Sequence, residues 1–261
     1  NIRIDSADAV DQNATVSTGG SGTILVTAVS GIDMSTGGGQ TTQTAGGNIR
    51  LTVSGEADLV LGLVDATSAG DVSLSAGGSI TDGNGGGTVN VIADELKLVA
   101  DSDGGGVGLI GNHENANGTP LVNANAIDIT VAEVAASAAQ GIYLQETDSV
   151  LIDAVPSVDV VQVNFNSTAP TVGDTALSDL ATTANGPIKL VTLNGTITAN
   201  EGSDADGSVI AHGTGDVLLQ SRETAEATAA DVVINASVTS TSGNIRIDSA
   251  DAVDQNATVS T

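Results

Sequence analysis

The most constraining feature of this 261-residue chain is an internal repeat without a single substitution. Residues 1–18 read NIRIDSADAVDQNATVST, and residues 244–261 carry the same 18 letters. We interpret residues 1–243 as one tandem repeat unit of a continuous β-solenoid, and residues 244–261 as the first coil of the next unit. Near-identical tandem units usually build elongated assemblies. The repeat therefore favours a fibre over an enzyme.

The composition suits thin, stacked strands better than a compact globular core. The chain has 33 Gly, one Tyr, one Phe, one Met and no Trp, although 40% of its residues are apolar. Aromatic side chains normally supply much of the buried area in a core, whereas Ala, Val, Ile and Leu stack well in strands. Disorder is the alternative for an acidic, glycine-rich chain. A mean hydropathy of +0.18 and regular apolar alternation argue against it.

The charge balance limits the partners. Lys and Arg total 6 against 32 Asp and Glu, for a net charge of −26. Nucleic acids and anionic lipid surfaces need a basic footprint, so we expect neither as a partner. Most of the carboxylates are expected to keep a long surface soluble. The absence of cysteine excludes disulfides and thiolate metal sites, and no apolar run approaches the ~20 residues of a membrane span.

A short strand motif recurs along the chain. It consists of Gly, a variable residue, and then Ile, Leu or Val at alternating positions, which is the period of a β-strand. It starts at Gly22, Gly47, Gly70, Gly87, Gly141, Gly186, Gly215 and Gly243. The glycine is expected to provide a turn with positive φ or a close backbone approach. The spacing of the starts predicts an all-β fold, a right-handed parallel β-helix (β-solenoid) with about eleven coils per 243-residue unit.

The motifs G-N-I-R-L at Gly47 and G-D-V-S-L at Gly70, followed by G-S-I and G-T-I strands, resemble the repeats of filamentous haemagglutinin-like bacterial exoproteins. That resemblance implies parallel β-helices that act as secreted fibres or giant surface adhesins. Residues 145–185 depart from the pattern, because they lack a glycine-led start and contain Pro156 and Pro170. We expect irregular coils or an insertion there.

Candidate sites are sparse. Two turns place carboxylates at i and i+2 before glycine: Asp101 with Asp103, and Asp204 with Asp206. This arrangement is similar to the start of a calcium loop, although Asp and Gly also favour tight turns without any ion. We therefore name these four residues as calcium candidates and expect no other cofactor. His113 and His212 stand alone in polar segments, and we assign no catalytic residues.

The sequence thus predicts a structural function: a stiff, acidic β-helical segment of an extracellular or cell-surface fibre. Its expected partners are adjacent identical repeats, with neighbouring fibres and cell-surface ligands as further candidates. The first alternative is an adhesin that recognises glycan or protein through residues 145–185. The second is a β-helix enzyme acting on polysaccharides. The chain disfavours it, because no adjacent Asp–Asp pair is present to act as acid and base. A string of Ig-like domains is the alternative fold, disfavoured by the scarcity of aromatics.

Overall fold

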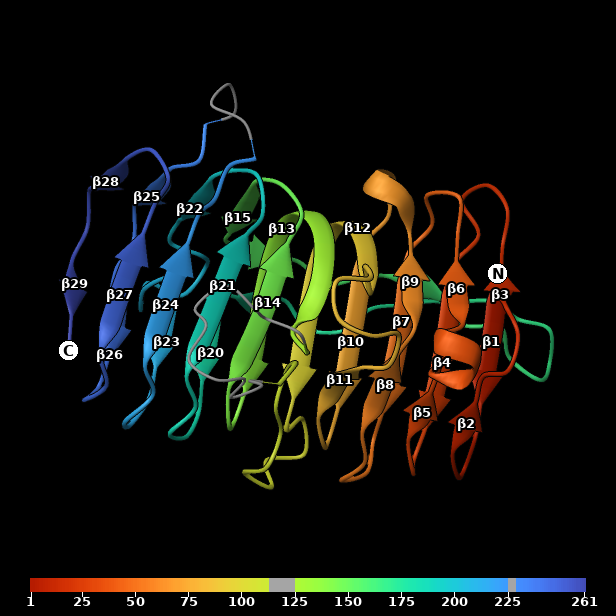
Figure 1. Cartoon of the computed structure of the whole chain (residues 1–261). Coiled ribbons are helices and arrows are strands. Elements are labelled where there is room, and N and C mark those ends of the chain that lie inside the picture. Colours follow the sequence, from red (N-terminus) through yellow and green to blue (C-terminus); the bar gives the residue numbers. More distant parts are fainter. Residues whose placement is uncertain (113–124, 225–228) are drawn as a thin grey trace.

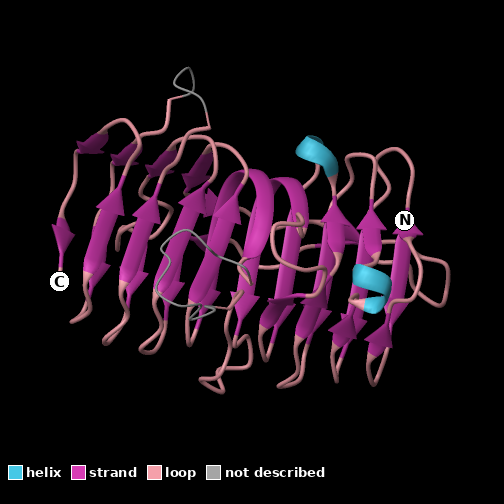
Figure 2. Cartoon of the chain, in the orientation of Figure 1, coloured by secondary structure: helices cyan, strands magenta, loops and turns pink. Residues whose placement is uncertain are grey.

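The computed structural model of the protein describes residues 1–112, 125–224 and 229–261. These residues are almost entirely strands and loops, with two single-turn 3₁₀ segments, η1 (Thr36–Gly38) and η2 (Thr67–Ala69) (Figure 2). The predicted all-β architecture is confirmed. Within the described ranges, none of the helical segments is long and apolar enough to cross a membrane.

Most strands belong to three parallel ladders, which the chain visits in turn and which we name A, B and C (Figure 1). Ladder A contains β1 (Ile2–Asp5), β4 (Ile24–Ala28), β7 (Ile49–Val53), β10 (Val72–Ala76), the second halves of β12 (Val91–Ala100) and β13 (Ile127–Ala138), β20 (Leu180–Thr182), β23 (Val209–Ala211), β26 (Val238–Ser240) and β29 (Val259–Ser260). Ladder B contains β2 (Val10–Asp11), β5 (Ile32–Asp33), β8 (Leu59–Leu61), β11 (Ile80–Asp82), the bridging residue Ile110, β14 (Ile142–Glu146), β21 (Ile188–Thr192), β24 (Val217–Gln220) and β27 (Ile245–Asp248).

Ladder C is less regular than the other two. Its first strands are β3 (Val16–Ser17), β6 (Thr41–Gln43), β9 (Leu63–Asp65) and the first halves of β12 and β13. Its later strands are β15 (Val150–Ile152), β22 (Ile197–Ala199), β25 (Val232–Ile234) and β28 (Val253–Gln255). The two series meet at β13, where Ile129 pairs with Glu146 of β14 and Glu133 pairs with Leu151 of β15. The resulting long parallel sheet is consistent with a parallel β-helix.

The number of coils is lower than the eleven predicted. We define a coil as the chain between successive strands of one ladder. Within residues 1–243 of the described chain, ladder A has nine strands, from β1 to β26. Early coils are short, as from Ile2 to Ile24, but later coils are longer, as from Leu180 to Val209. Longer loops and a large insertion after β15 therefore account for the missing coils.

The two copies of the 18-residue repeat form the same three strands on different ladders. In the first copy β1, β2 and β3 lie on ladders A, B and C, whereas in the second copy β27, β28 and β29 lie on B, C and A. Ile245, the copy of Ile2, thus occupies the same register position of ladder B as Val10. In the middle of this ladder the register passes through the bridged residues Ile80, Ile110 and Ile142. One unit therefore advances eight coils and one further ladder, or about eight and one-third coils.

The core is a set of stacked aliphatic columns. The alternating residues of β7 that face inward are Ile49, Leu51 and Val53, each almost completely buried. The same register positions in β10 are also aliphatic and buried. Inward residues of parallel strands lie about 4.8 Å above one another, so uniform Val, Ile and Leu fill the interior without large rings. Burial of this apolar surface stabilises the ladders at roughly 25 cal/mol per Å².

Residues 153–179 leave the ladders and form an antiparallel hairpin, which we call the arm. β16 (Ala154–Val155) pairs with β19 (Leu177–Ser178), and β17 (Val160–Val161) pairs with β18 (Thr171–Val172). The arm lies within the stretch 145–185 that departs from the repeat pattern. Figure 1 shows it crossing back towards the N-terminal end, where its tip extends past β1.

Candidate functional site

Three carboxylates from two parts of the chain meet where the arm rejoins ladder A. Asp179 lies between β19 and β20, while Asp204 and Asp206 lie in the loop between β22 and β23. One carboxylate oxygen of each residue lies within 4.8 Å of those of the other two. Asp204 and Asp206 are exposed, whereas Asp179 is 1% exposed. The group therefore combines one buried carboxylate with two that are open to solvent.

The carboxylate of Asp179 has no hydrogen-bond partner among the described residues, although both of its oxygens are buried. Its backbone is held firmly, because its carbonyl accepts from the Ala136 amide at 2.8 Å. Its φ of +67° is in the left-handed region, which Asp tolerates better than most residues. Burial, followed by the charges of Asp204 and Asp206, raises the pKa of Asp179 to about 8, and the adjacent Gly202 amide offsets only a small part of this rise. An unpaired buried carboxylate is costly, and a bound cation would remove that cost.

Other buried carboxylates of the chain are hydrogen-bonded. Glu146 is fully buried and accepts hydrogen bonds from the amides of Val131, Thr147 and Asp148. Asp128 accepts from the Gly87 amide and from the side chain of Gln145. Burial raises the pKa of Glu146 to about 8 and that of Asp128 to about 6, while these hydrogen bonds oppose the rise. Asp179 differs from both, because burial and the neighbouring charges of Asp204 and Asp206 outweigh the effect of the one nearby amide, that of Gly202.

The structure separates the two turns that sequence analysis nominated for calcium. Asp101 and Asp103 lie in the turn after β12, where they accept hydrogen bonds from the amides of Gly106 and Gly105, at 2.6 and 3.1 Å. Those contacts are typical of Asp in a tight turn. Among the described residues, Asp204 and Asp206 instead gather with Asp179. His212 is exposed in the turn after β23, and His113 lies outside the described residues.

Sequence reasoning missed Asp179. It is a single Asp in the segment L-S-D-L, without a glycine or a second carboxylate beside it. It joins the site because Ser178 and Ser203, from consecutive coils, are hydrogen-bonded at 2.8 Å and bring the base of the arm against the loop. No local sequence pattern predicts that contact.

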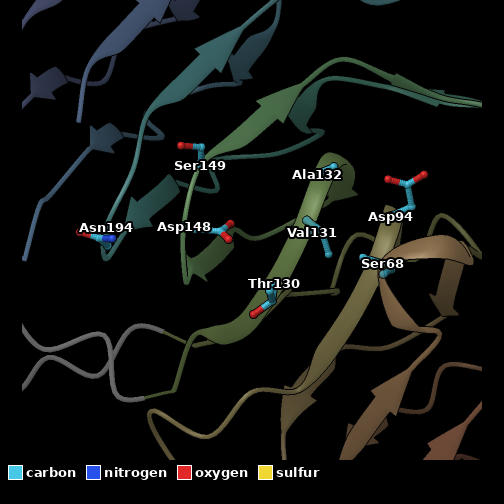
Figure 3. Close-up of a pocket in the computed structure, with 9 residues that line it drawn as sticks. Ser68, Asp94, Thr130, Val131, Ala132, Asp148, Ser149 and Asn194 are labelled. Atoms are coloured by element: carbon cyan, nitrogen blue, oxygen red, sulfur yellow. The ribbon is translucent and has the colours of Figure 1, made fainter. Parts of the chain in front are cut away.

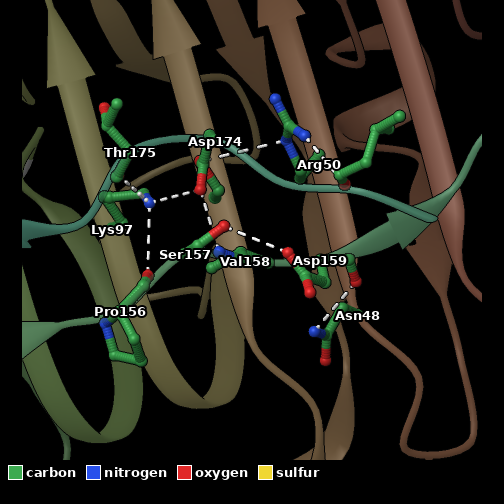
Figure 4. A network of polar contacts seen from close by, with 11 residues as sticks. Asn48, Arg50, Lys97, Pro156, Ser157, Val158, Asp159, Asp174 and Thr175 are labelled. Atoms are coloured by element: carbon green, nitrogen blue, oxygen red, sulfur yellow. Dashed lines mark hydrogen bonds and ion pairs between the residues drawn. The ribbon is translucent and has the colours of Figure 1, made fainter.

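The arm is anchored by basic side chains in one column on the outer face of ladder A, and Figure 4 shows two of them, Arg50 and Lys97. Arg3, Leu25, Arg50, Ser73 and Lys97 share one register position on successive strands. Lys97 is 2% exposed; its Nζ contacts Asp174 Oδ1 at 2.5 Å and donates to the Thr175 carbonyl at 2.6 Å. Arg50 lies 3.9 Å from the same carboxylate. Arg3 donates to the Val163 carbonyl of the arm at 3.2 Å, so three of the six basic residues of the chain hold the arm.

Asp174 is the centre of this anchor. It also accepts from the Ser73 hydroxyl at 2.5 Å and from the Val158 amide at 2.8 Å. Although burial alone would raise its pKa, the hydrogen bonds from Lys97 and Ser73 hold the pKa of Asp174 below its ordinary value. Asp174 is thus charged in the folded protein. It connects the two sides of the arm hairpin to β7, β10 and β12 of ladder A.

A groove of about 460 Å³ lies where the two series of ladder C meet (Figure 3). It is lined by Ser68, Ala93, Asp94, Thr130, Val131, Ala132, Asp148, Ser149 and Asn194. None of these lining residues is aromatic or basic. The groove therefore offers no ring on which a sugar could stack and no cation for an acidic ligand, which makes the carboxylate site the better candidate.

No family model, no curated protein and no solved structure matches the chain. What the chain does must therefore be inferred from its repeat, its ladders and its sites.

Proposed function

We propose that the chain is a structural segment of a long extracellular bacterial fibre or giant surface adhesin, built as a stiff, acidic, right-handed β-helical shaft. The observation that carries this proposal is the strand pairing of the repeated segment at the C-terminal end of the fold. Its second copy continues all three ladders, with β27, β28 and β29 each paired to a strand of the coil before. A following unit would extend the same ladders without a linker.

The proposed mechanism is mechanical. Each interior strand of a ladder is hydrogen-bonded to the coils before and after it, so an axial or bending load is distributed over many backbone hydrogen bonds. The first and last coils are the weak points, because the inward residues Ile2, Ile4, Ile245 and Ile247 are only partly buried. Unpaired strand edges invite association, and adjacent identical units would cover these edges. The net charge of −26 would keep neighbouring shafts apart.

The resemblance to filamentous haemagglutinin-like exoproteins is consistent with this proposal, as is the cysteine-free, acidic composition. Adhesion through residues 145–185 is the alternative. The fully exposed Phe165 at the tip of the arm favours it, because aromatic residues are enriched in protein–protein contact surfaces. A partner for Phe165 within the fibre itself is argued below.

The length of a tandem protein tests the proposal. Proteins with one, two and three 243-residue units, each closed by residues 244–261, are expected to lengthen by about 40 Å per unit, from about eight and one-third coils at 4.8 Å each. Eleven coils would give about 50 Å. Electron microscopy and small-angle scattering measure the increment. An increment above about 100 Å would contradict a continuous shaft, because separate domains on linkers span more length per residue.

A further inference from the structure

We propose that Asp179, Asp204 and Asp206 bind a divalent cation, and that calcium is the ion this site takes. The argument rests on Asp179, whose buried carboxylate points into the group without a hydrogen-bond partner among the described residues. Two further carboxylates, those of Asp204 and Asp206 in the next coil, lie within 4.8 Å of it. A cation is the ligand that would satisfy all three together.

The donors identify the class of ion. Every ligand offered is a carboxylate oxygen, without the imidazole or thiolate that zinc and copper favour. Calcium accepts flexible, partly hydrated oxygen geometry, whereas magnesium demands a near-ideal octahedron. Because Asp204 and Asp206 are exposed, water can complete the coordination. The bound ion would fasten the base of the arm to the loop between β22 and β23.

Calcium titration of the 261-residue chain by calorimetry, at physiological ionic strength, tests this site. We expect one saturable site with a dissociation constant on the order of 10⁻⁴ M, as in extracellular calcium modules. Asp179→Asn is expected to weaken binding at least about tenfold. Asn keeps the shape and tolerates the left-handed backbone, so far-ultraviolet circular dichroism should be unchanged. Asp206→Asn, at an exposed position, should weaken binding as well.

Asp103→Asn is the matched control, because Asp103 is also an exposed acidic turn residue but accepts a glycine amide. Calcium affinity should not change in that variant. Equal binding by the Asp179→Asn protein, or only weak and unsaturable binding by the original chain, would overturn the site. Magnesium binding as tight as that of calcium would overturn the choice of ion.

A different observation carries a second inference, which rests on the proposed tandem fibre. Val163 and Asn164 of the arm accept hydrogen bonds from Arg3, at 3.2 and 2.9 Å, on the first strand of ladder A. The tip continues beyond this strand (Figure 1), and Phe165 in it is fully exposed. In a tandem array, the space beyond the first coil belongs to the last coil of the preceding unit.

The pairings identify what the tip would meet there. Arg246 is the copy of Arg3 and lies on ladder B, in one outward column with Leu218, Lys189 and Tyr143. The Arg246 side chain is 64% exposed, whereas that of Arg3, beneath the arm, is 20% exposed. We infer that the arm of the following unit covers Arg246 and that its Phe165 packs against Leu218 of the preceding unit. The arm would then clamp each joint.

The one-ladder shift between repeats sets the geometry of the fibre. Because each unit advances about eight and one-third coils, the arm of every unit would lie one ladder further round than the arm before it. The arms of the fourth and first units would again share a ladder. Three rows of arms would therefore run along the shaft.

Disulfide trapping in a two-unit protein tests the joint, since the chain contains no cysteine. We expect Phe165→Cys in the second unit to cross-link under mild oxidation with Leu218→Cys in the first. Thr239→Cys in the first unit is the matched control, because Thr239 lies in the same coil but on ladder A. Cross-linking to position 239 instead, or to neither position, would overturn the joint. If the unit length is about 40 Å and no cross-link forms, the shaft stands and only the clamp fails.

Discussion

Replacing Lys97 by methionine is expected to release the arm from ladder A. Methionine keeps the apolar stem but removes the ammonium group, so Asp174 loses the partner that contacts it at 2.5 Å. Removing one member of a buried ion pair typically costs about 3–5 kcal/mol, and the hydrogen bonds that Ser73 and Val158 still donate to Asp174 place this variant at the lower end. We expect a loss of about 3 kcal/mol. Hydrogen exchange at the Gln162 amide, which donates to the Pro170 carbonyl within the arm, would report it.

Arg246→Met is the matched control for this prediction. Arg246 also pairs with an aspartate, Asp248, at 2.8 Å, but its side chain is largely exposed. Exposed ion pairs contribute about 0–1 kcal/mol, so the control should retain the stability of the starting protein in a denaturant titration. Equal losses in the two variants would show that the Lys97 pair does not anchor the arm. A Lys97→Met protein whose arm amides exchange no faster would show the same.

Replacing Gly215 by alanine is expected to destabilise the ladders by about 2–3 kcal/mol, the upper part of the usual cost of overpacking. A Cβ at this position would lie 2.1 Å from the carbonyl oxygen of Gly186 in the coil before. Gly243 in turn stands in the same relation to Gly215, at 2.2 Å. These atoms are backbone of adjacent coils and cannot move aside without breaking the ladder. Urea denaturation followed by circular dichroism measures the loss.

Gly19→Ala is the control for this substitution. A Cβ at Gly19 would meet no atom within 4 Å. Alanine there reduces the freedom of the unfolded chain and should leave the stability unchanged or raise it by a few tenths of a kcal/mol. A neutral Gly215→Ala variant would contradict the close stacking of glycines between coils.

The sequence by itself determined the strands and their inward faces. The alternation in I-R-L-T-V and V-S-L-S-A predicts strands that the structure places at β7 and β10, with Ile49, Leu51, Val72 and Leu74 buried. The glycine before each strand was expected either to make a turn or to allow a close approach, and Gly215 does the second. These features are local, because strand period and side-chain size act within a few residues and repeat in each coil.

Only the tertiary structure decided how coils and sites come together. Arg3, Arg50 and Lys97 look scattered in the sequence but lie two coils apart in one column beneath the arm. Asp179 meets Asp204 and Asp206 because the arm returns to ladder A beside the loop of the next coil. The coil count and the shift of the second repeat from ladder A to ladder B also depend on loop lengths summed over the whole unit. Contacts between distant segments depend on that sum, and no single motif contains it.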